Sequence, residues 1–186
     1  LNNLSCGANQ VSAEFDTAPE DGVVSPSRVS TTSSVLVGCH GQIVWVKIKG
    51  RGSFQNSAGL KEYVGRMVRR SHRDFVVDLE DCEQMDSTFM GTLAGVALRL
   101  REIGQGGLRV INVNERNAGL LCSLGLDQIF SVEEAGGGLS VPPEAEPLQP
   151  APAGDPNAVD QQKTVLEAHE ALVEADSTNE VKFHDV

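Results

Sequence analysis

Residues 75–130 read FVVDLEDCEQMDSTFMGTLAGVALRLREIGQGGLRVINVNERNAGLLCSLGLDQIF, and this stretch decides the fold. It opens with a continuous apolar run over residues 75–79, which is typical of a buried strand. Residues 88–103 place apolar side chains at helical spacing, and the glycine-rich residues 104–107 end that helix. Residues 108–113 form a second buried-strand pattern. Strands alternating with helices predict an α/β sandwich with a mixed sheet.

The sheet is expected to begin upstream of this stretch. Two β-rich runs, residues 34–38 and 42–49, flank Cys39-His40-Gly41 and predict a hairpin. Residues 57–71 then carry apolar residues at helical spacing, and Asn56 or Ser57 is available as the N-cap. These elements place a helix between the hairpin and the first buried strand.

Downstream of residue 113 the pattern continues with one more helix and one more strand. Residues 118–124 predict a short helix with Gly125 after it, and residues 127–132 predict a closing strand. The expected core is therefore a four- to five-stranded mixed sheet with packed helices.

Charge and proline mark the limits of this core. The net charge is −11, yet residues 39–135 hold twelve basic and twelve acidic residues, so the acidity belongs to the flanks. All eight prolines lie outside residues 27–141. Without a basic stripe, binding to nucleic acid or to an anionic membrane surface has little electrostatic support.

The flanks are expected to differ from the core. Residues 1–32 are rich in small and polar residues and are predicted to be disordered. The folded domain is expected over residues 33–135, and residues 136–160, which contain GGG and PPEAEPLQPAPAGDP, are predicted to form a flexible linker. Residues 161–186 have the spacing of an acidic helix.

The apolar runs and the spacing of cysteine and histidine residues do not predict a membrane span, a metal site or a disulfide. No run approaches the roughly 18 apolar residues of a membrane span, so a soluble cytoplasmic protein is expected. The four cysteines and four histidines are scattered without metal-ligand spacing. We therefore expect free thiols, no metal and no cofactor.

Several short motifs, taken in their order and spacing, resemble the STAS domain of bacterial anti-sigma factor antagonists. They are Asp78-Leu79, Met85-Asp86-Ser87-Thr88, Leu100-Arg101, Gly106-Gly107, Asn112-Val113 and Leu124-Gly125-Leu126. The resemblance covers about residues 35 to 135 and implies a STAS-type fold. It also implies that Ser87 is the phosphate acceptor, with Thr88 as the neighbouring, alternative hydroxyl.

The partner-binding surface that the resemblance implies surrounds this serine. It consists of Asp86, Ser87, Thr88, Phe89, Met90 and Gly91. Phe89 stands where many relatives have glycine, which predicts a bulkier and more apolar contact surface. Many relatives also carry an aspartate in the loop after the second strand, where this chain reads Gly50-Arg51-Gly52-Ser53.

Simpler interpretations of the same residues exist. Asp86 and Ser87 are both preferred N-caps, and a cap and a phosphorylation switch can coexist. The acidic residues Glu80, Asp81, Glu83 and Asp86 could hold a cation or could simply be solvated. Gly91 and Gly95 form a GxxxG pattern, which in a soluble helix predicts close packing of the helix on the sheet.

The C-terminal helical pattern leaves two alternatives open. Val165, His169, Leu172 and Val173 recur at helical spacing. The helix is either a partly formed acidic appendage or the last STAS helix, folding back on the core after an inserted linker.

The resemblance implies a function in partner switching and no enzymatic activity. The unphosphorylated protein would bind an anti-sigma factor serine kinase of the GHKL type and so release the sigma factor. Phosphorylation of Ser87 would end this binding, and a PP2C-type phosphatase would restore it. The alternative is a scaffold or accessory subunit of a sensory or lipid-transport complex with no sigma-factor role.

Overall fold

The computed structural model describes residues 33–136, 147–152 and 158–183. The segment expected to be disordered, residues 1–32, lies outside the described residues, and so do residues 137–146 and 153–157 of the expected linker.

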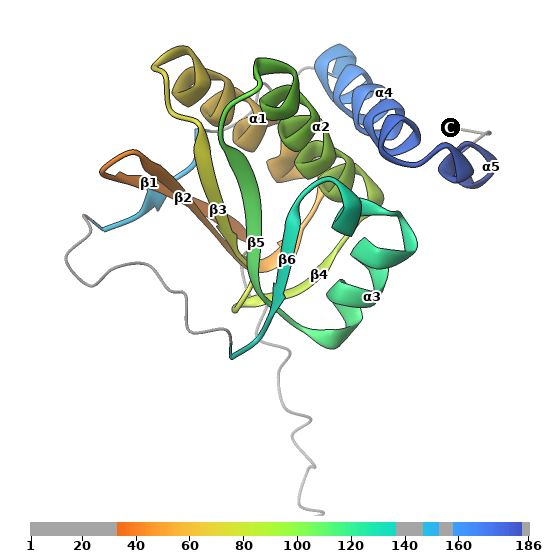
Figure 1. Ribbon diagram of the computed structural model, residues 1–186, viewed down its shortest axis with the longest axis horizontal. Coiled ribbons are helices and arrows are strands. Elements are labelled where there is room, and N and C mark those ends of the chain that lie inside the picture. Colours follow the sequence, from red (N-terminus) through yellow and green to blue (C-terminus); the bar gives the residue numbers. More distant parts are fainter. Residues whose placement is uncertain (1–32, 137–146, 153–157, 184–186) are drawn as a thin grey trace, which may run out of the picture. The chain divides into compact units, whose positions relative to one another are not determined.

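A mixed β-sheet forms the centre of the described structure (Figure 1). The strand order is β6-β5-β3-β2-β1-β7, and β4 pairs with β2 off this path. The strands are β1 (Ser34–His40), β2 (Ile43–Gly52), β3 (Asp74–Asp78), β4 (Cys82–Met85), β5 (Gly107–Val113), β6 (Ser131–Glu134) and β7 (Gln149–Pro150). Strands β2, β3, β5 and β6 run parallel, and β1 is antiparallel to β2. The predicted α/β class with a mixed sheet is confirmed.

The hairpin between β1 and β2 turns where the sequence predicts it. Gly41 has a φ of +59°, a backbone conformation that a tight turn requires and that glycine adopts without steric cost. The pairing brings His40 opposite Ile43 and continues to Ser34 opposite Lys49.

The helices follow the strands in alternation. The described helices are α1 (Phe54–Arg69), α2 (Ser87–Ile103), α3 (Glu115–Ser123), α4 (Ala158–Ala175) and α5 (Glu180–Phe183), with 3-10 turns η1 (Leu126–Gln128) and η2 (Ser177–Asn179). Figure 1 shows α1 and α2 over the sheet, with α4 beside α2. None of the helices in the described ranges has the length and apolar character needed to cross a membrane.

The two faces of the sheet are covered unequally. On β2, Val44, Val46 and Ile48 belong to the large core between sheet and helices. Trp45 belongs instead to a small cluster with Val76 and Ile111, so it lies on the opposite face. Side chains alternate between the faces of a strand, which is why the continuous apolar run of β2 serves two clusters.

The structure adds two short strands that the sequence pattern did not predict. Strand β4 follows the turn after β3 and runs parallel to the end of β2. Strand β7 falls in the segment expected to be a flexible linker, and it pairs with the edge strand β1, where Ala151 N donates to Val35 O at 2.7 Å. The described part of that segment therefore differs from the prediction, because backbone pairing at an open sheet edge offsets its weak intrinsic preference for a strand.

Helix α4 packs against α2, and Gly91 sets how closely. A Cβ atom at Gly91 would lie 2.2 Å from the carbonyl oxygen of Ala168, which only glycine avoids. At Gly95 a Cβ would lie 3.7 Å from the Ala171 Cβ, which is ordinary contact. The GxxxG pattern thus serves helix-to-helix packing, and the prediction that it faces the sheet is wrong for Gly91.

The C-terminal end of α4 and the residues after it are fixed to the end of α3. Leu172 is fully buried, and the buried amide of Asn179 donates to the carbonyl oxygens of Leu124 and Leu172 at 2.9 Å each. Lys182 Nζ donates to Ser123 O at 2.7 Å. These contacts fix the C-terminal end of the helix to the core.

Candidate site at the start of helix α2

The end of strand β4 brings the chain to the predicted switch residues. Asp86 N donates to the carbonyl oxygen of Gly52 at 2.9 Å, which continues the pairing of β4 with β2 by one residue. Asp86 has extended backbone angles, and α2 begins at the next residue, Ser87. Asp86 is therefore the N-cap, and the serine occupies the first helical position.

The Asp86 carboxylate joins the starts of two helices. Its Oδ1 accepts from the backbone N–H of Phe89 at 2.9 Å, which caps α2. Its Oδ2 accepts from the backbone N–H of Phe54 at 3.0 Å, at the first residue of α1. Both N–H groups are free of helical partners, and a carboxylate is favoured at the positive end of each helix dipole. The predicted capping role of Asp86 is confirmed.

The Ser87 hydroxyl faces the C-terminal helix. Ser87 is half-buried, and its Oγ lies 3.2 Å from Nε2 of His169 on α4. The two residues are 82 positions apart in the chain, so the contact exists only because α4 packs on α2. The hydroxyl that the sequence singles out is thus partly covered.

His169 is held in a mostly apolar setting. The residue is 8 % exposed, and its ring stacks on Phe183 with centroids 4.8 Å apart. Its second ring nitrogen, Nδ1, is buried without a hydrogen-bond partner among the described residues. Burial lowers the pKa of His169 from its usual 6.5, and the charge of Asp86 partly opposes this shift. The imidazole is consequently favoured in its neutral form.

The structure separates the six predicted partner-binding residues into two groups. Asp86 and Ser87 are half-buried, whereas Thr88, Phe89, Met90 and Gly91 are buried. Phe89 is fully buried and fills the space beside Gly52, where a Cβ would lie 2.6 Å from its ring. The expectation that Phe89 makes the contact surface bulkier is therefore wrong, because the ring belongs to the core.

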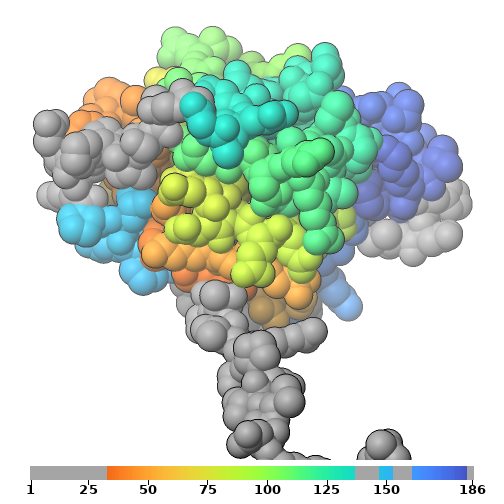
Figure 2. All heavy atoms as spheres, turned by 90° about the horizontal axis from the view of Figure 1, so that it is seen from below, coloured from red at the N-terminus to blue at the C-terminus, as the bar shows by residue number. Residues whose placement is uncertain are grey.

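The exposed surroundings of the site come from other elements. Phe54, whose N–H binds Asp86, is 41 % exposed at the start of α1. Figure 2 shows the face on which β4 and α3 lie next to each other, with β4 in yellow-green and α3 in green to teal. The side chains of Asn114 and Asn117 both donate to the carbonyl oxygen of Cys82, which fixes α3 against β4.

The acidic residues that precede the site surround a lysine. Lys47 Nζ lies 2.8 Å from Glu80, 3.2 Å from Asp81 and 3.5 Å from the buried Asp78. Burial of the ammonium acts to lower the pKa of Lys47, but its hydrogen bonds to Glu80 and Asp81 outweigh this and raise that pKa. The ammonium group of Lys47 therefore occupies the space between Glu80 and Asp81, two of the acidic residues that could have held a bound cation.

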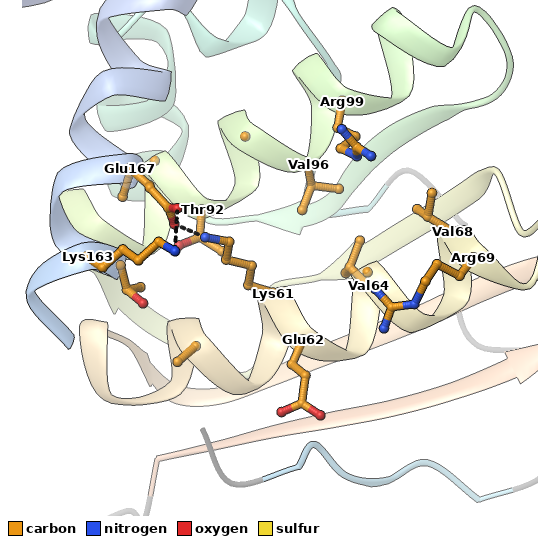
Figure 3. Close-up of a pocket in the computed structure, with 16 residues that line it drawn as sticks. Lys61, Glu62, Val64, Val68, Arg69, Thr92, Val96, Arg99, Lys163 and Glu167 are labelled. Carbon is orange, nitrogen blue, oxygen red and sulfur yellow. Dashed lines mark hydrogen bonds and ion pairs between the residues drawn. The ribbon is translucent and has the colours of Figure 1, made fainter. Parts of the chain in front are cut away.

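A groove of about 640 Å³ lies between α1, α2 and the beginning of α4 (Figure 3). Its floor is formed by small and aliphatic residues such as Val64 and Val96. Near one end, Lys61 and Lys163 both pair with Glu167, which ties α4 to α1. Ser87 does not line this groove, so the groove and the switch residue are separate features of the α2 surface.

Sequence reasoning missed His169 as a member of the site. Its signal was present, since a histidine stands among the apolar positions of the C-terminal helical pattern. A polar ring on a buried helix face needs a hydrogen-bond partner, but periodicity does not say which residue supplies it.

Comparison with known proteins agrees with the fold. The family model described as the STAS domain matches residues 34–135. A candidate anti-sigma factor antagonist from Thermotoga maritima is similar in structure, with a TM-score of 0.50 and 18% sequence identity. The match covers 54% of this chain and 86% of that chain. An anti-sigma factor antagonist from Mycobacterium paratuberculosis has 19% identity, covers 73% of this chain and 95% of its own, and has a TM-score of 0.49.

No protein of curated function matches the sequence significantly. The family match spans more than half of the chain and includes Asp86 and Ser87. The chain therefore belongs to the family of STAS-domain proteins.

Proposed function

We propose that this protein is an anti-sigma factor antagonist controlled by phosphorylation of Ser87. In its unphosphorylated form it binds an anti-sigma factor that is also a GHKL-type serine kinase, and the kinase releases its sigma factor. Phosphate on Ser87 ends the binding, and a PP2C-type phosphatase restores it. ATP and Mg²⁺ belong to the kinase, and we expect no catalytic activity and no cofactor in this chain.

The observation that carries this proposal is the position of the Ser87 hydroxyl on a STAS domain. It occupies the first residue of α2, directly after the Asp86 cap. Helix starts carry unpaired N–H groups and a partial positive charge, which tolerate a phosphate group. The Met85-Asp86-Ser87-Thr88 motif and its neighbours give independent support, because their order and spacing resemble those of phosphorylated relatives.

The physical basis of the switch is a charge at an interface. Phosphoserine adds about −1.5 to −2 charges at neutral pH. The domain can carry this charge at a helix start, but a partner that covers the site must desolvate it. Without a matching cation such burial costs several kcal/mol, and each 1.4 kcal/mol is about tenfold in affinity.

The partner surface that we propose centres on the accessible residues of the site. Asp86 and Ser87 are partly exposed, and Phe54, whose backbone N–H donates to Asp86, has an exposed apolar side chain. An exposed aromatic ring next to polar residues is a common anchor in protein interfaces. We expect Thr88, Phe89, Met90 and Gly91 to support this surface from within the core.

Phosphosite mapping tests the assignment. The protein is incubated with ATP and the kinase that co-purifies with it, and the phosphate is located by mass spectrometry. Ser87→Ala should abolish incorporation, and Thr88→Ala, which removes the alternative hydroxyl, should leave it unchanged. Phosphate on another residue would remove Ser87 from the proposal, and absence of any such kinase would favour the scaffold alternative.

A further inference from the structure

We propose that phosphorylation of Ser87 releases helix α4 from helix α2, so that the C-terminal helix responds to the state of the switch. This inference rests on the proposed function in one respect, namely that Ser87 is the residue that receives phosphate. It goes beyond that function because it assigns a conformational role to residues that lie outside the matched domain.

The first observation is the space around the hydroxyl. Ser87 Oγ lies 3.2 Å from His169 Nε2, which is hydrogen-bond distance. A phosphorus atom with three oxygens cannot occupy this gap while the ring stays in place. The ring itself is fixed between the α2 surface and Phe183, and it is 8 % exposed. Phosphate under the docked helix therefore requires the helix or the serine side chain to move.

The second observation is the charge near the hydroxyl. The charge that acts on His169 is the carboxylate of Asp86, the residue next to Ser87, and it has the same sign as phosphate. His169 could balance the phosphate only as an imidazolium, in which both ring nitrogens carry a proton, and the buried Nδ1 has no acceptor among the described residues. Neither Asp86 nor a neutral His169 therefore supplies a compensating cation for phosphate in the docked arrangement.

Rotation of the phosphoserine toward solvent does not remove the cost. It withdraws the side-chain oxygen of Ser87 from Nε2 of His169, and Nδ1 already has no hydrogen-bond partner among the described residues, so both nitrogens of the buried imidazole are then unpaired there. Buried polar groups without partners destabilise the state that buries them. Both outcomes therefore weaken the docking of α4 on α2.

Release of α4 would change the surface of the domain as well as its charge. The face of α2 that contains Gly91 and Gly95 is covered by Ala168 and Ala171 of α4. Removing α4 exposes this face, which lies next to the phosphorylated residue. The switch would then present a different shape to its partner in each state.

Amide hydrogen exchange of the full chain tests the proposal. Phosphoserine is installed at position 87 during translation, so that no kinase is needed, and exchange is compared with the serine form. We expect amides of α4 to exchange roughly tenfold faster or more with phosphoserine, because losing one buried hydrogen bond weakens the docking of the helix by about that factor. Exchange in α2 and in the central strands should stay unchanged. Unchanged or slower exchange in α4 would overturn the proposal.

Two glycine variants provide a matched control that does not touch Ser87. In Gly91→Ala the new Cβ would meet the Ala168 backbone at 2.2 Å, so α4 should exchange fast without phosphate. Gly95→Ala places the same group on the same helix at an ordinary 3.7 Å and should keep α4 protected. Protection of α4 in Gly91→Ala equal to that in Gly95→Ala would contradict the docking geometry on which the proposal depends.

His169 variants test the contact directly. His169→Ala should loosen α4 in the serine form and shrink the further effect of phosphoserine, whereas His169→Gln, which can still hydrogen-bond Ser87, should retain most of the protection. Hydrogen exchange requires no partner protein, so this proposal can fail while the proposed function holds. If phosphorylation abolishes kinase binding but α4 stays protected from exchange, only the release of α4 is overturned.

Discussion

At the scale of single residues, Asp86 performs more than one task in the site. Its carboxylate caps α2 through Phe89 N and contacts the start of α1 through Phe54 N, at 2.9 and 3.0 Å. Its position before Ser87 is therefore explained by folding alone. The switch and the cap use neighbouring residues, so their effects can be separated by mutation.

We predict that Asp86→Ala lowers the free energy of unfolding by about 1–3 kcal/mol, because two helix starts lose an acceptor. Asp86→Asn, which keeps an acceptor oxygen, should lose less. Urea denaturation of both variants measures the difference. Equal stability of Asp86→Ala and the parent protein would show that the carboxylate does not support both helices.

Lys47 is the second residue whose role can be tested alone. It lies among Asp78, Glu80 and Asp81, and the first of these is buried. Lys47→Met should destabilise the fold by roughly 1–3 kcal/mol, an estimate that is discounted because Glu80 and Asp81 are largely exposed. Lys49→Met changes an exposed lysine on the same strand and should have little effect. Comparable losses in the two variants would contradict a specific role for Lys47.

At the scale of elements, helix α4 packs on α2 and covers part of Ser87 through His169. Its buried face includes Ala168, His169 and Leu172, while Leu166 on another face is 53 % exposed. Leu172→Ala should lower stability by about 2–4 kcal/mol, as expected for a fully buried leucine. Leu166→Ala should change it by less than about 0.5 kcal/mol. Thermal denaturation that fails to distinguish these variants would show that α4 is not docked as described.

The docking of α4 should also depend on pH. Burial lowers the pKa of His169 below 6.5, so the docked helix favours the neutral ring, and the free helix takes up a proton more readily. The contribution of His169 is thus present above about pH 6.5 and is lost as the pH falls through that value toward the lower pKa of the docked state.

We therefore predict that acidification from about pH 7 to about pH 5 loosens α4 more in the parent protein than in His169→Gln, which has no titrating ring. Hydrogen exchange of α4 at both pH values measures this, after correction for the intrinsic pH dependence of exchange. Other titrating groups are common to the two proteins and cancel in the comparison. An identical pH response in both would remove His169 as the cause.

The elements also show what the sequence can and cannot predict. The strong apolar runs of β2, β3 and β5 and the helical spacing of α2 were sufficient to predict the mixed α/β sheet. The start of α1 was missed because Ser53, rather than Asn56 or Ser57, is the cap, and Asn56 instead accepts from Ser53 N at 2.9 Å. The short strands β4 and β7 depend on pairing with β2 and β1, which local patterns do not contain.

The site shows the same division between local and distant information. The cap at Asp86 and the helix start at Ser87 follow from residues that are adjacent in the chain, and they were predicted. The burial of Phe89 and the contact of His169 with Ser87 depend on Gly52 and on α4, which lie far away in the sequence. Tertiary packing decides such contacts.

At the scale of the whole molecule, charge is distributed unevenly along the chain. The net charge of −11 comes from the flanks, while residues 39–135 are balanced. A neutral domain surface changes its electrostatic character strongly when one phosphoserine is added. The acidic C-terminal helix lies against the same α2 surface, so its position and the charge at Ser87 are expected to influence each other.

The central claim is that phosphate on Ser87 controls binding to an anti-sigma factor kinase. Titration of the full chain against that kinase, with serine, phosphoserine or aspartate at position 87, measures it most directly. We predict tight binding of the serine form and of Ser87→Ala, and weakening by about two orders of magnitude or more for phosphoserine, with Ser87→Asp weakened in the same direction. Equal affinity of the serine and phosphoserine forms would contradict the claim.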